Sequence, residues 1–316
     1  MHLNKKLNIG LRLFIGFIVL FLLVRQIEFT QIVKILSNSN LMWVFLSFLI
    51  FLLGVIIIAY GLMILFRSSI KIKFTEWIKY FLMTHAVSMV VPGKLGQLSL
   101  IYFIRDKGIN IGSSTALLIV DKIISVIIFG LIAVVGLFLM SEEIYVNANI
   151  ILIGCLLLIL VGTLFMFSNY SRKLIKFVFG KYKIHFDEFF NTLINLTQNH
   201  KSNLIINILI TLIRPMFNGL VILLLFRSLG YNVGLIYSTL VSSLTIIASI
   251  IPITPNGLGI REGIGVFLFS RINLPLEASL SVYFMILIFN LSLSLIGGVL
   301  YFVHNKKLIN KKLDQI

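Results

Sequence analysis

The sequence contains two apolar stretches that are interrupted by proline and glycine: VPGKLGQLSL at residues 91–100 and IPITPNGLGIREG at residues 251–263. A long apolar run precedes each interruption, and a shorter one follows it. Proline lacks the backbone N–H that a helix needs and its ring collides with the preceding turn, while glycine weakens a helix interior. Each stretch therefore predicts a helix, a break and a short returning helix. We expect a first hairpin over about residues 77–104 and a second over about residues 235–270.

The composition places these hairpins in a membrane. Of 316 residues, 59% are hydrophobic and 12% are charged, and the mean hydropathy is +1.06. Soluble domains carry about 25% charged residues, so a soluble globule is excluded. The 27 phenylalanines exclude a disordered chain. The net charge of +16 is then typical of cytoplasmic loops that contact anionic lipids, and nucleic acid is not an expected partner.

Six other stretches are apolar enough to cross a bilayer, which takes about 20 residues for ~30 Å of hydrocarbon. They are Ile9–Val24, Leu41–Phe66, Ser113–Met140, Ile150–Ser168, Asn203–Phe226 and Ala278–Val303. The returning arms of the two hairpins are too short to cross, so both hairpins are expected to be re-entrant. The predicted fold is an all-α polytopic membrane protein, with about six full transmembrane helices and two re-entrant hairpins in one domain over residues 1–316.

The distribution of basic residues predicts the orientation, because cytoplasmic loops are enriched in Lys and Arg. With a cytoplasmic N-terminus, six crossings and two re-entrant hairpins, 19 of the 27 basic residues fall on the cytoplasmic side and four on the other. We therefore expect a multi-pass protein of the cell (plasma) membrane with both termini in the cytoplasm. The hairpins then enter from opposite sides, which is typical of an inverted repeat with a site at mid-membrane.

The segment from Tyr170 to His200 differs from the rest of the chain. It mixes basic residues with phenylalanines, namely Phe177, Phe179, Phe186, Phe189 and Phe190. This pattern is typical of a helix that lies along the cytoplasmic membrane interface. A plain solvated connector is the alternative.

Ionisable residues inside apolar segments are the candidates for function, since each costs roughly 2.5–3.5 kcal/mol at membrane depth without a partner or a wet cavity. Lys94 lies within the first break, beside backbone N–H groups that suit an anion such as a lipid phosphate. Arg261 follows the second break and can bind a phosphate through two N–H groups. Its neighbour Glu262 could hold Arg261 or carry a proton, although adjacent helix residues point about 100° apart. A snorkelling lysine and a self-neutralising turn pair are the structural alternatives.

Asp121 and Lys122 lie one third of the way along the third predicted span. Asp121 could pair with Lys94 or Arg261, and we weigh a structural salt bridge equally with a transport role. Arg214 lies near the middle of the fifth predicted span, beside a proline that is expected to kink the helix. It is a further candidate for the cavity.

The candidate substrate-binding residues are Pro92, Gly93, Lys94, Gly96, Gln97, Asp121, Lys122, Arg214, Pro255, Asn256, Gly257, Gly259, Arg261 and Glu262. No catalytic residue, metal site or cofactor is expected. The five histidines are scattered without ligand spacing, and the single Cys155 has no partner in the sequence. Nucleotide-binding and nucleophile motifs are also missing from the sequence.

The motifs VPGKLGQLSLIYFIRDKG…LLIVDKIISV and IPITPNGLGIREGI resemble those of the flippase-like transmembrane family. Its best-known member is the membrane half of lysylphosphatidylglycerol synthase, the multiple peptide resistance factor. The resemblance covers about residues 8–304. Asn256 stands where the family usually has glycine, and Gln97 stands where it commonly has a glutamate that is followed by arginine. The missing glutamate puts a proton-coupled role at that position in doubt.

The resemblance implies a protein that moves lipids with charged or glycosylated headgroups between leaflets. In the synthase a separate soluble domain performs aminoacyl transfer, and we expect a stand-alone form without that domain and without enzyme activity. The alternatives are a membrane enzyme or accessory subunit of glycolipid or lysylphosphatidylglycerol synthesis, and a scaffold without transport. Membrane lipids with anionic headgroups are the expected partners, with a second copy of the chain or a separate lipid-modifying enzyme left open.

Overall fold

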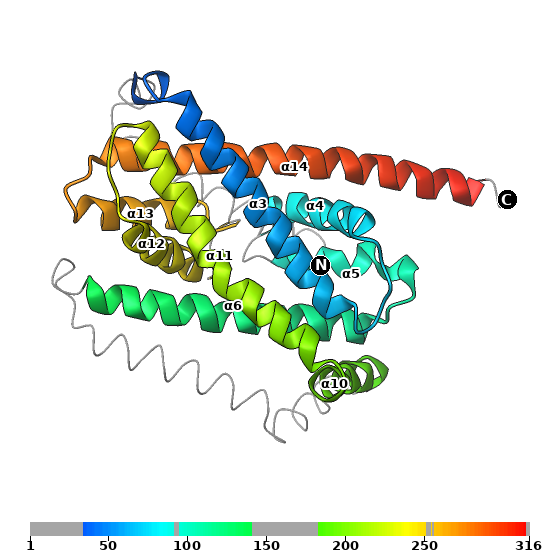
Figure 1. The fold of residues 1–316 in the computed structure, drawn as a ribbon. Coiled ribbons are helices and arrows are strands. Elements are labelled where there is room, and N and C mark those ends of the chain that lie inside the picture. The colour runs from blue at the N-terminus through cyan, green and yellow to red at the C-terminus, as the bar shows by residue number, and fades with distance from the viewer. Residues whose placement is uncertain (1–33, 92–94, 141–182, 251–253, 255, 314–316) are drawn as a thin grey trace.

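The computed structural model describes residues 34–91, 95–140, 183–250, 254 and 256–313, and Figure 1 shows their arrangement. These parts of the chain form helices without strands. The α-helices are α3 (Leu41–Phe66), α4 (Phe74–Val90), α5 (Ser99–Phe103), α6 (Ile111–Leu139), α10 (Lys183–Gln198), α11 (Lys201–Ser228), α12 (Leu235–Ala248), α13 (Ile260–Ser270) and α14 (Leu276–Leu313). Two short 3₁₀ helices, η1 (Leu95–Leu98) and η2 (Arg105–Lys107), flank α5.

Four helices are long and apolar enough to cross a membrane: α3, α6, α11 and the part of α14 from Leu276 to His304. Their positions match four of the six predicted spans. The other two, Ile9–Val24 and Ile150–Ser168, lie outside the described residues. Many large apolar side chains of these helices are exposed, including Leu295 and Phe302 on α14, which suits a surface that faces lipid.

The helices α3 and α11 run side by side along most of their length (Figure 1). Small residues permit this approach: a Cβ at Gly54 would touch Phe217, and one at Gly61 would touch Ile210. The Ser47 hydroxyl on α3 also donates to the Val221 carbonyl on α11 at 3.1 Å. Close backbone contact of this kind is the usual way in which membrane helices associate.

The first predicted hairpin is present as α4 followed by η1 and α5, which pack back against α4. Gly96 makes this possible, because a Cβ there would lie 2.5 Å from the Ser88 Cα. At the other end of the returning arm, Lys107 forms an ion pair with Glu76 in the first turn of α4. The returning arm is therefore attached to α4 at both of its ends.

The second predicted hairpin is present as α12 and α13, which also pack together. The Tyr237 hydroxyl on α12 donates to the Leu268 carbonyl on α13 at 2.7 Å. Gly257 has φ +75°, and a Cβ there would collide with the Ser249 side chain. The short returning helix that the sequence predicts begins at Ile260, directly after the break.

The two hairpins pack against opposite halves of the long helix α14. Towards its start, Tyr283 lies directly against Gly265 of α13. Towards its end, Gly297 lies directly against the Leu82 carbonyl of α4, and His304 meets the Tyr80 ring edge to face at 5.8 Å. The two hairpins thus run along α14 from its two ends, and their tips meet near its middle.

The helix α10 covers the N-terminal end of α6. The Glu188 carboxylate accepts from the Gly112 N–H at 3.1 Å, and the Thr192 hydroxyl donates to Ser113 at 2.9 Å. A carboxylate at a helix N-terminus also interacts favourably with the helix dipole. Of the interfacial segment predicted for residues 170–200, the part before residue 183 lies outside the described residues.

Candidate functional site

The tips of the two hairpins touch each other. The Asn256 side-chain amide of the second break donates to the Met89 sulfur, near the end of α4, at 3.0 Å. Asn256 has φ +48°, a left-handed conformation that glycine adopts more easily than other residues and that asparagine tolerates. The two interrupted stretches of the sequence are therefore neighbours in space, although 167 residues separate them.

A small pocket lies between the tip of the second hairpin and α14. Asn256, Leu258, Arg261 and Glu262 form one side, and Tyr283, Ile286, Leu287 and Asn290 form the other. Its volume of about 10 Å³ is close to the room that one water molecule needs. The Arg261 Nε–H is buried and has no hydrogen-bond partner among the described residues. An unsatisfied guanidinium beside a pocket is a donor for a further hydrogen bond.

Glu262 supports the local backbone. Its carboxylate accepts from the Gly259 N–H at 2.6 Å, at the first turn of α13. A negative charge at this position satisfies a free N–H and complements the helix dipole. The sequence left open whether Glu262 holds Arg261 or carries a proton. The structure gives its carboxylate a capping contact, and within the described part of the chain Glu262 and Arg261 do not form an ion pair.

Three polar residues near the pocket were not among the predicted site residues. Tyr283 and Asn290 line the pocket from α14, and His85 of α4 contacts the Asn290 backbone. The available signal was weak, because each is a single polar residue in a long apolar run and such residues also occur as ordinary helix contacts. The packing of α13 on α14 brings Tyr283 and Asn290 near the second break, and the packing of α4 on α14 adds His85.

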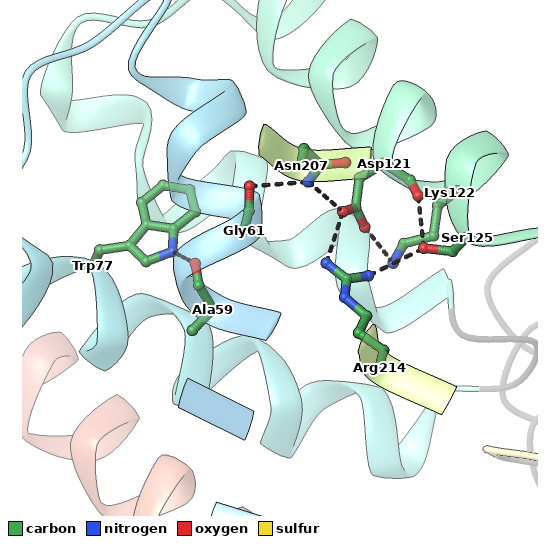
Figure 2. A network of polar contacts seen from close by, with 8 residues as sticks. All are labelled: Ala59, Gly61, Trp77, Asp121, Lys122, Ser125, Asn207 and Arg214. Atoms are coloured by element: carbon green, nitrogen blue, oxygen red, sulfur yellow. Dashed lines mark hydrogen bonds and ion pairs between the residues drawn. The ribbon is translucent and has the colours of Figure 1, made fainter. Parts of the chain in front are cut away.

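A second polar cluster ties α6 to α3 and α11 (Figure 2). Asp121 is 1% exposed. Its Oδ1 accepts from Arg214 Nη2 and from Asn207 Nδ2, each at 3.2 Å, and Lys122 Nζ donates to its Oδ2 at 3.1 Å. Asn207 also donates to the Gly61 carbonyl of α3 at 2.9 Å. Arg214 Nη1 donates to Ser125 at 3.1 Å, which completes the network.

These contacts bear on one sequence hypothesis. The partners considered for Asp121 were Lys94, which lies outside the described residues, and Arg261; its described partners are Arg214 and Lys122. Arg214 lies on α11, so the buried ion pair joins helices that are far apart in the sequence. Predicted site residues thus occur in two separate places. The Asp121 network lies between α3, α6 and α11, and the pocket at the hairpin tips lies between α4, α13 and α14.

The remaining predicted site residues divide by whether the structure describes them. Pro92, Gly93, Lys94 and Pro255 lie outside the described residues. Gly96, Gly257 and Gly259 are buried at the hairpin tips. The Gln97 side-chain oxygen is buried without a partner within the described ranges.

These features define the class of the molecule: a polytopic helical membrane protein with polar groups gathered inside an apolar bundle. The chain belongs to the family described as the lysylphosphatidylglycerol synthase transmembrane region, whose model matches residues 9–298. It is also similar to a UPF0104 membrane protein of Methanocaldococcus jannaschii, with 23% identity over 321 residues that cover 95% of this chain and 96% of the relative. The family that the motifs indicated is thereby confirmed.

Proposed function

We propose that this protein moves a lipid with a polar or charged headgroup between the two leaflets of the cell membrane. The observation that carries the proposal is the meeting of the two hairpin tips beside the Arg261 pocket. The headgroup would enter between the tips while the acyl chains stay in the bilayer. Without hydrogen-bond donors, a buried phosphate would carry a prohibitive free-energy cost. Arg261 and the N–H groups of the breaks would supply such donors, with Lys94 as a further cation.

The packing along α14 supports the proposed membrane placement. The first hairpin lies along the C-terminal half of α14 and the second along its N-terminal half. If α14 spans the bilayer, the hairpins approach from opposite faces and end at mid-depth. This is the arrangement of re-entrant elements in transporters built from inverted repeats. The charge distribution then puts both termini in the cytoplasm.

The small pocket represents a closed arrangement of the tips in this proposal. A lipid headgroup needs far more room than about 10 Å³. Transport would therefore require the tips to separate, and the hydrogen bond between Asn256 and Met89, which joins the described parts of the tips, is a weak contact that permits separation.

The test is lipid translocation by the full chain in proteoliposomes, measured as the fraction of fluorescent phospholipid that an impermeant quencher reaches. Arg261→Ala should slow translocation at least roughly tenfold, which corresponds to about 1.4 kcal/mol. Lys94→Ala should have a similar effect. The matched control is Arg271→Ala, since Arg271 is exposed at the end of the same helix and stacks on the Phe267 ring at 4.7 Å. Full transport by both the Arg261 and the Lys94 variants would contradict the proposal.

The second candidate is an accessory subunit or membrane enzyme of lipid modification. The family description favours it, because that description refers to the transmembrane region of a synthase. An assay of the purified chain for aminoacyl or sugar transfer to a lipid separates the two candidates. Transfer by the purified chain would favour the enzyme, and translocation without transfer would favour the transporter.

A further inference from the structure

Glu262 is a buried carboxylate that forms no ion pair within the described part of the chain. The residue is 8% exposed, and it lines the pocket between the second hairpin and α14. Its carboxylate accepts from backbone N–H groups, those of Gly259 and of Glu262 itself. A protonated carboxyl group retains acceptor capacity, so it can accept from the same N–H groups. The capping contact is therefore compatible with both protonation states.

The surroundings of Glu262 contain one permanent charge among the described residues. The titratable groups that the described helices place around it are Arg261 on α13, Tyr283 on α14, His85 on α4 and Tyr237 on α12. Arg261 and Tyr283 line the pocket. His85 contacts the backbone of Asn290, a further pocket residue. Because arginine is always protonated in proteins, Arg261 is the group that would hold an anionic ligand near Glu262.

An anion that Arg261 binds would lie close to the Glu262 carboxylate. The two residues are adjacent in the chain and line the same pocket of about 10 Å³. Like charges at such a separation repel strongly inside a protein, where the dielectric constant is low. A proton on Glu262 removes this repulsion. Since linkage between two ligands is reciprocal, a bound phosphate favours the proton by the same factor by which the proton favours the phosphate.

We propose that Glu262 binds one proton together with each anionic headgroup, so that the protein cotransports protons with an anionic lipid. This inference rests on the transport function proposed above. The carboxylate takes a proton from water on the side where the headgroup enters and returns it to water on the side where the headgroup leaves. The lipid itself is not changed chemically. A headgroup with one negative charge and its proton then cross the membrane without net charge.

The test uses the full chain in proteoliposomes with a short-chain fluorescent phosphatidylglycerol, whose entry is measured by albumin extraction of the probe that stays outside. A pH-sensitive dye trapped in the lumen records proton entry. In the wild type, lipid entry should acidify the lumen. Its rate should rise by up to about tenfold for each unit by which the external pH falls, because one proton is bound. A potassium diffusion potential should leave this rate unchanged.

Glu262→Gln keeps a side-chain oxygen for the Gly259 N–H and resembles the protonated carboxyl group. At every pH it should move the lipid at the rate that the wild type reaches in acid, and without proton entry. Its rate should depend on the membrane potential, because the lipid then crosses with its charge. The matched control is Glu277→Gln, since Glu277 also lies in the first turn of a helix but outside the pocket. This control and His85→Gln should keep the wild-type pH dependence.

Lipid entry into wild-type proteoliposomes without proton entry would overturn the inference, and this measurement decides the question even if a variant does not fold. A pH dependence that survives in Glu262→Gln would also overturn it. Loss of the pH dependence in a His85→Gln protein that still transports would assign the proton to His85 instead. A wild type that moves no lipid at any pH would refute the transport function as well, whereas transport without proton entry would refute this inference alone.

Discussion

Asp121 is the residue on which the central polar cluster depends. Its carboxylate lies between two cations and an amide, and it is almost fully buried. Its hydrogen-bond partners lie on α6 and α11. One of them, Asn207, also donates to the Gly61 carbonyl of α3. Asp121 therefore holds three helices together, and the substrate-binding role that the sequence suggested for it stays a prediction.

Asp121→Asn should destabilise the protein by about 3–5 kcal/mol, because it leaves the buried Arg214 without a counter-charge inside the bundle. Chemical or thermal unfolding in detergent would measure the loss. The double variant Asp121→Asn with Arg214→Met should recover part of it, since the unpaired buried guanidinium is then removed. A single variant as stable as the wild type would show that the ion pair has no structural role.

A second ion pair, at the surface, gives a pH dependence. Hydrogen bonding to Lys107 lowers the pKa of Glu76, and the same bond raises the pKa of Lys107. Stability from Glu76 is therefore present above its unfolded pKa of about 4.5 and is lost as the pH falls through the lower folded value. Stability from Lys107 is present below its unfolded pKa of about 10.5 and is lost as the pH rises through the folded value.

Glu76→Gln should therefore lower the unfolding midpoint slightly near neutral pH, and the difference from the wild type should vanish in acid once the pH lies below the lowered pKa of Glu76. Both side chains are more than 30% exposed, so the effect should stay below about 1 kcal/mol. Unfolding midpoints of the two proteins across this pH range test the prediction. A difference that stays constant into acid would mean that the ion pair is not its cause.

At the scale of elements, α14 holds α4 through a contact without intervening side chains. Gly297 lies directly against the Leu82 carbonyl, whereas a Cβ at the next residue, Gly298, would meet nothing within 4 Å. The two glycines are adjacent in the sequence, but only Gly297 packs against α4, whereas a side chain at Gly298 would have free space.

Gly297→Ala should destabilise the protein by about 1–3 kcal/mol, because the methyl group forces α14 away from α4. Gly298→Ala should be neutral or stabilising by up to about 1 kcal/mol, because alanine favours a helix. Parallel unfolding measurements on the two variants test this contrast. Equal effects at both positions would mean that α4 does not pack on this face of α14.

At the scale of the whole molecule, the two hairpins form one functional unit only if their tips stay together in one conformation and separate in another. The Asn256–Met89 contact marks the joined conformation. The proposed transport requires both conformations, and a covalent link between the tips would remove one of them.

Met89→Cys with Asn256→Cys, in a chain whose single Cys155 is replaced by alanine, should form a disulfide on oxidation. The oxidised protein should lose translocation in the proteoliposome assay and regain it on reduction, because the disulfide keeps the tips closed. The two single-cysteine variants serve as controls. Full transport by the cross-linked protein would show that lipid does not pass between the tips.

Much of this architecture followed from local features of the sequence. The spans were predictable because about 20 apolar residues in succession have few alternatives to a membrane helix. The hairpins were predictable because proline and glycine interrupt a helix wherever they occur. The short returning helix after the second break, which is α13, followed from the same local rules.

The partners of the polar residues were not predictable. Asp121 bonds to Arg214, which is 93 residues away in the sequence, and Met89 bonds to Asn256, which is 167 residues away. Composition and spacing describe one segment at a time, whereas a side-chain contact depends on how distant helices pack. The sequence thus determined that this is a helical membrane protein with two broken segments and buried charges, because hydropathy and backbone breaks are local properties. Only the tertiary structure decided which charges pair and that the breaks meet on α14, because pairing results from the packing of all the helices together.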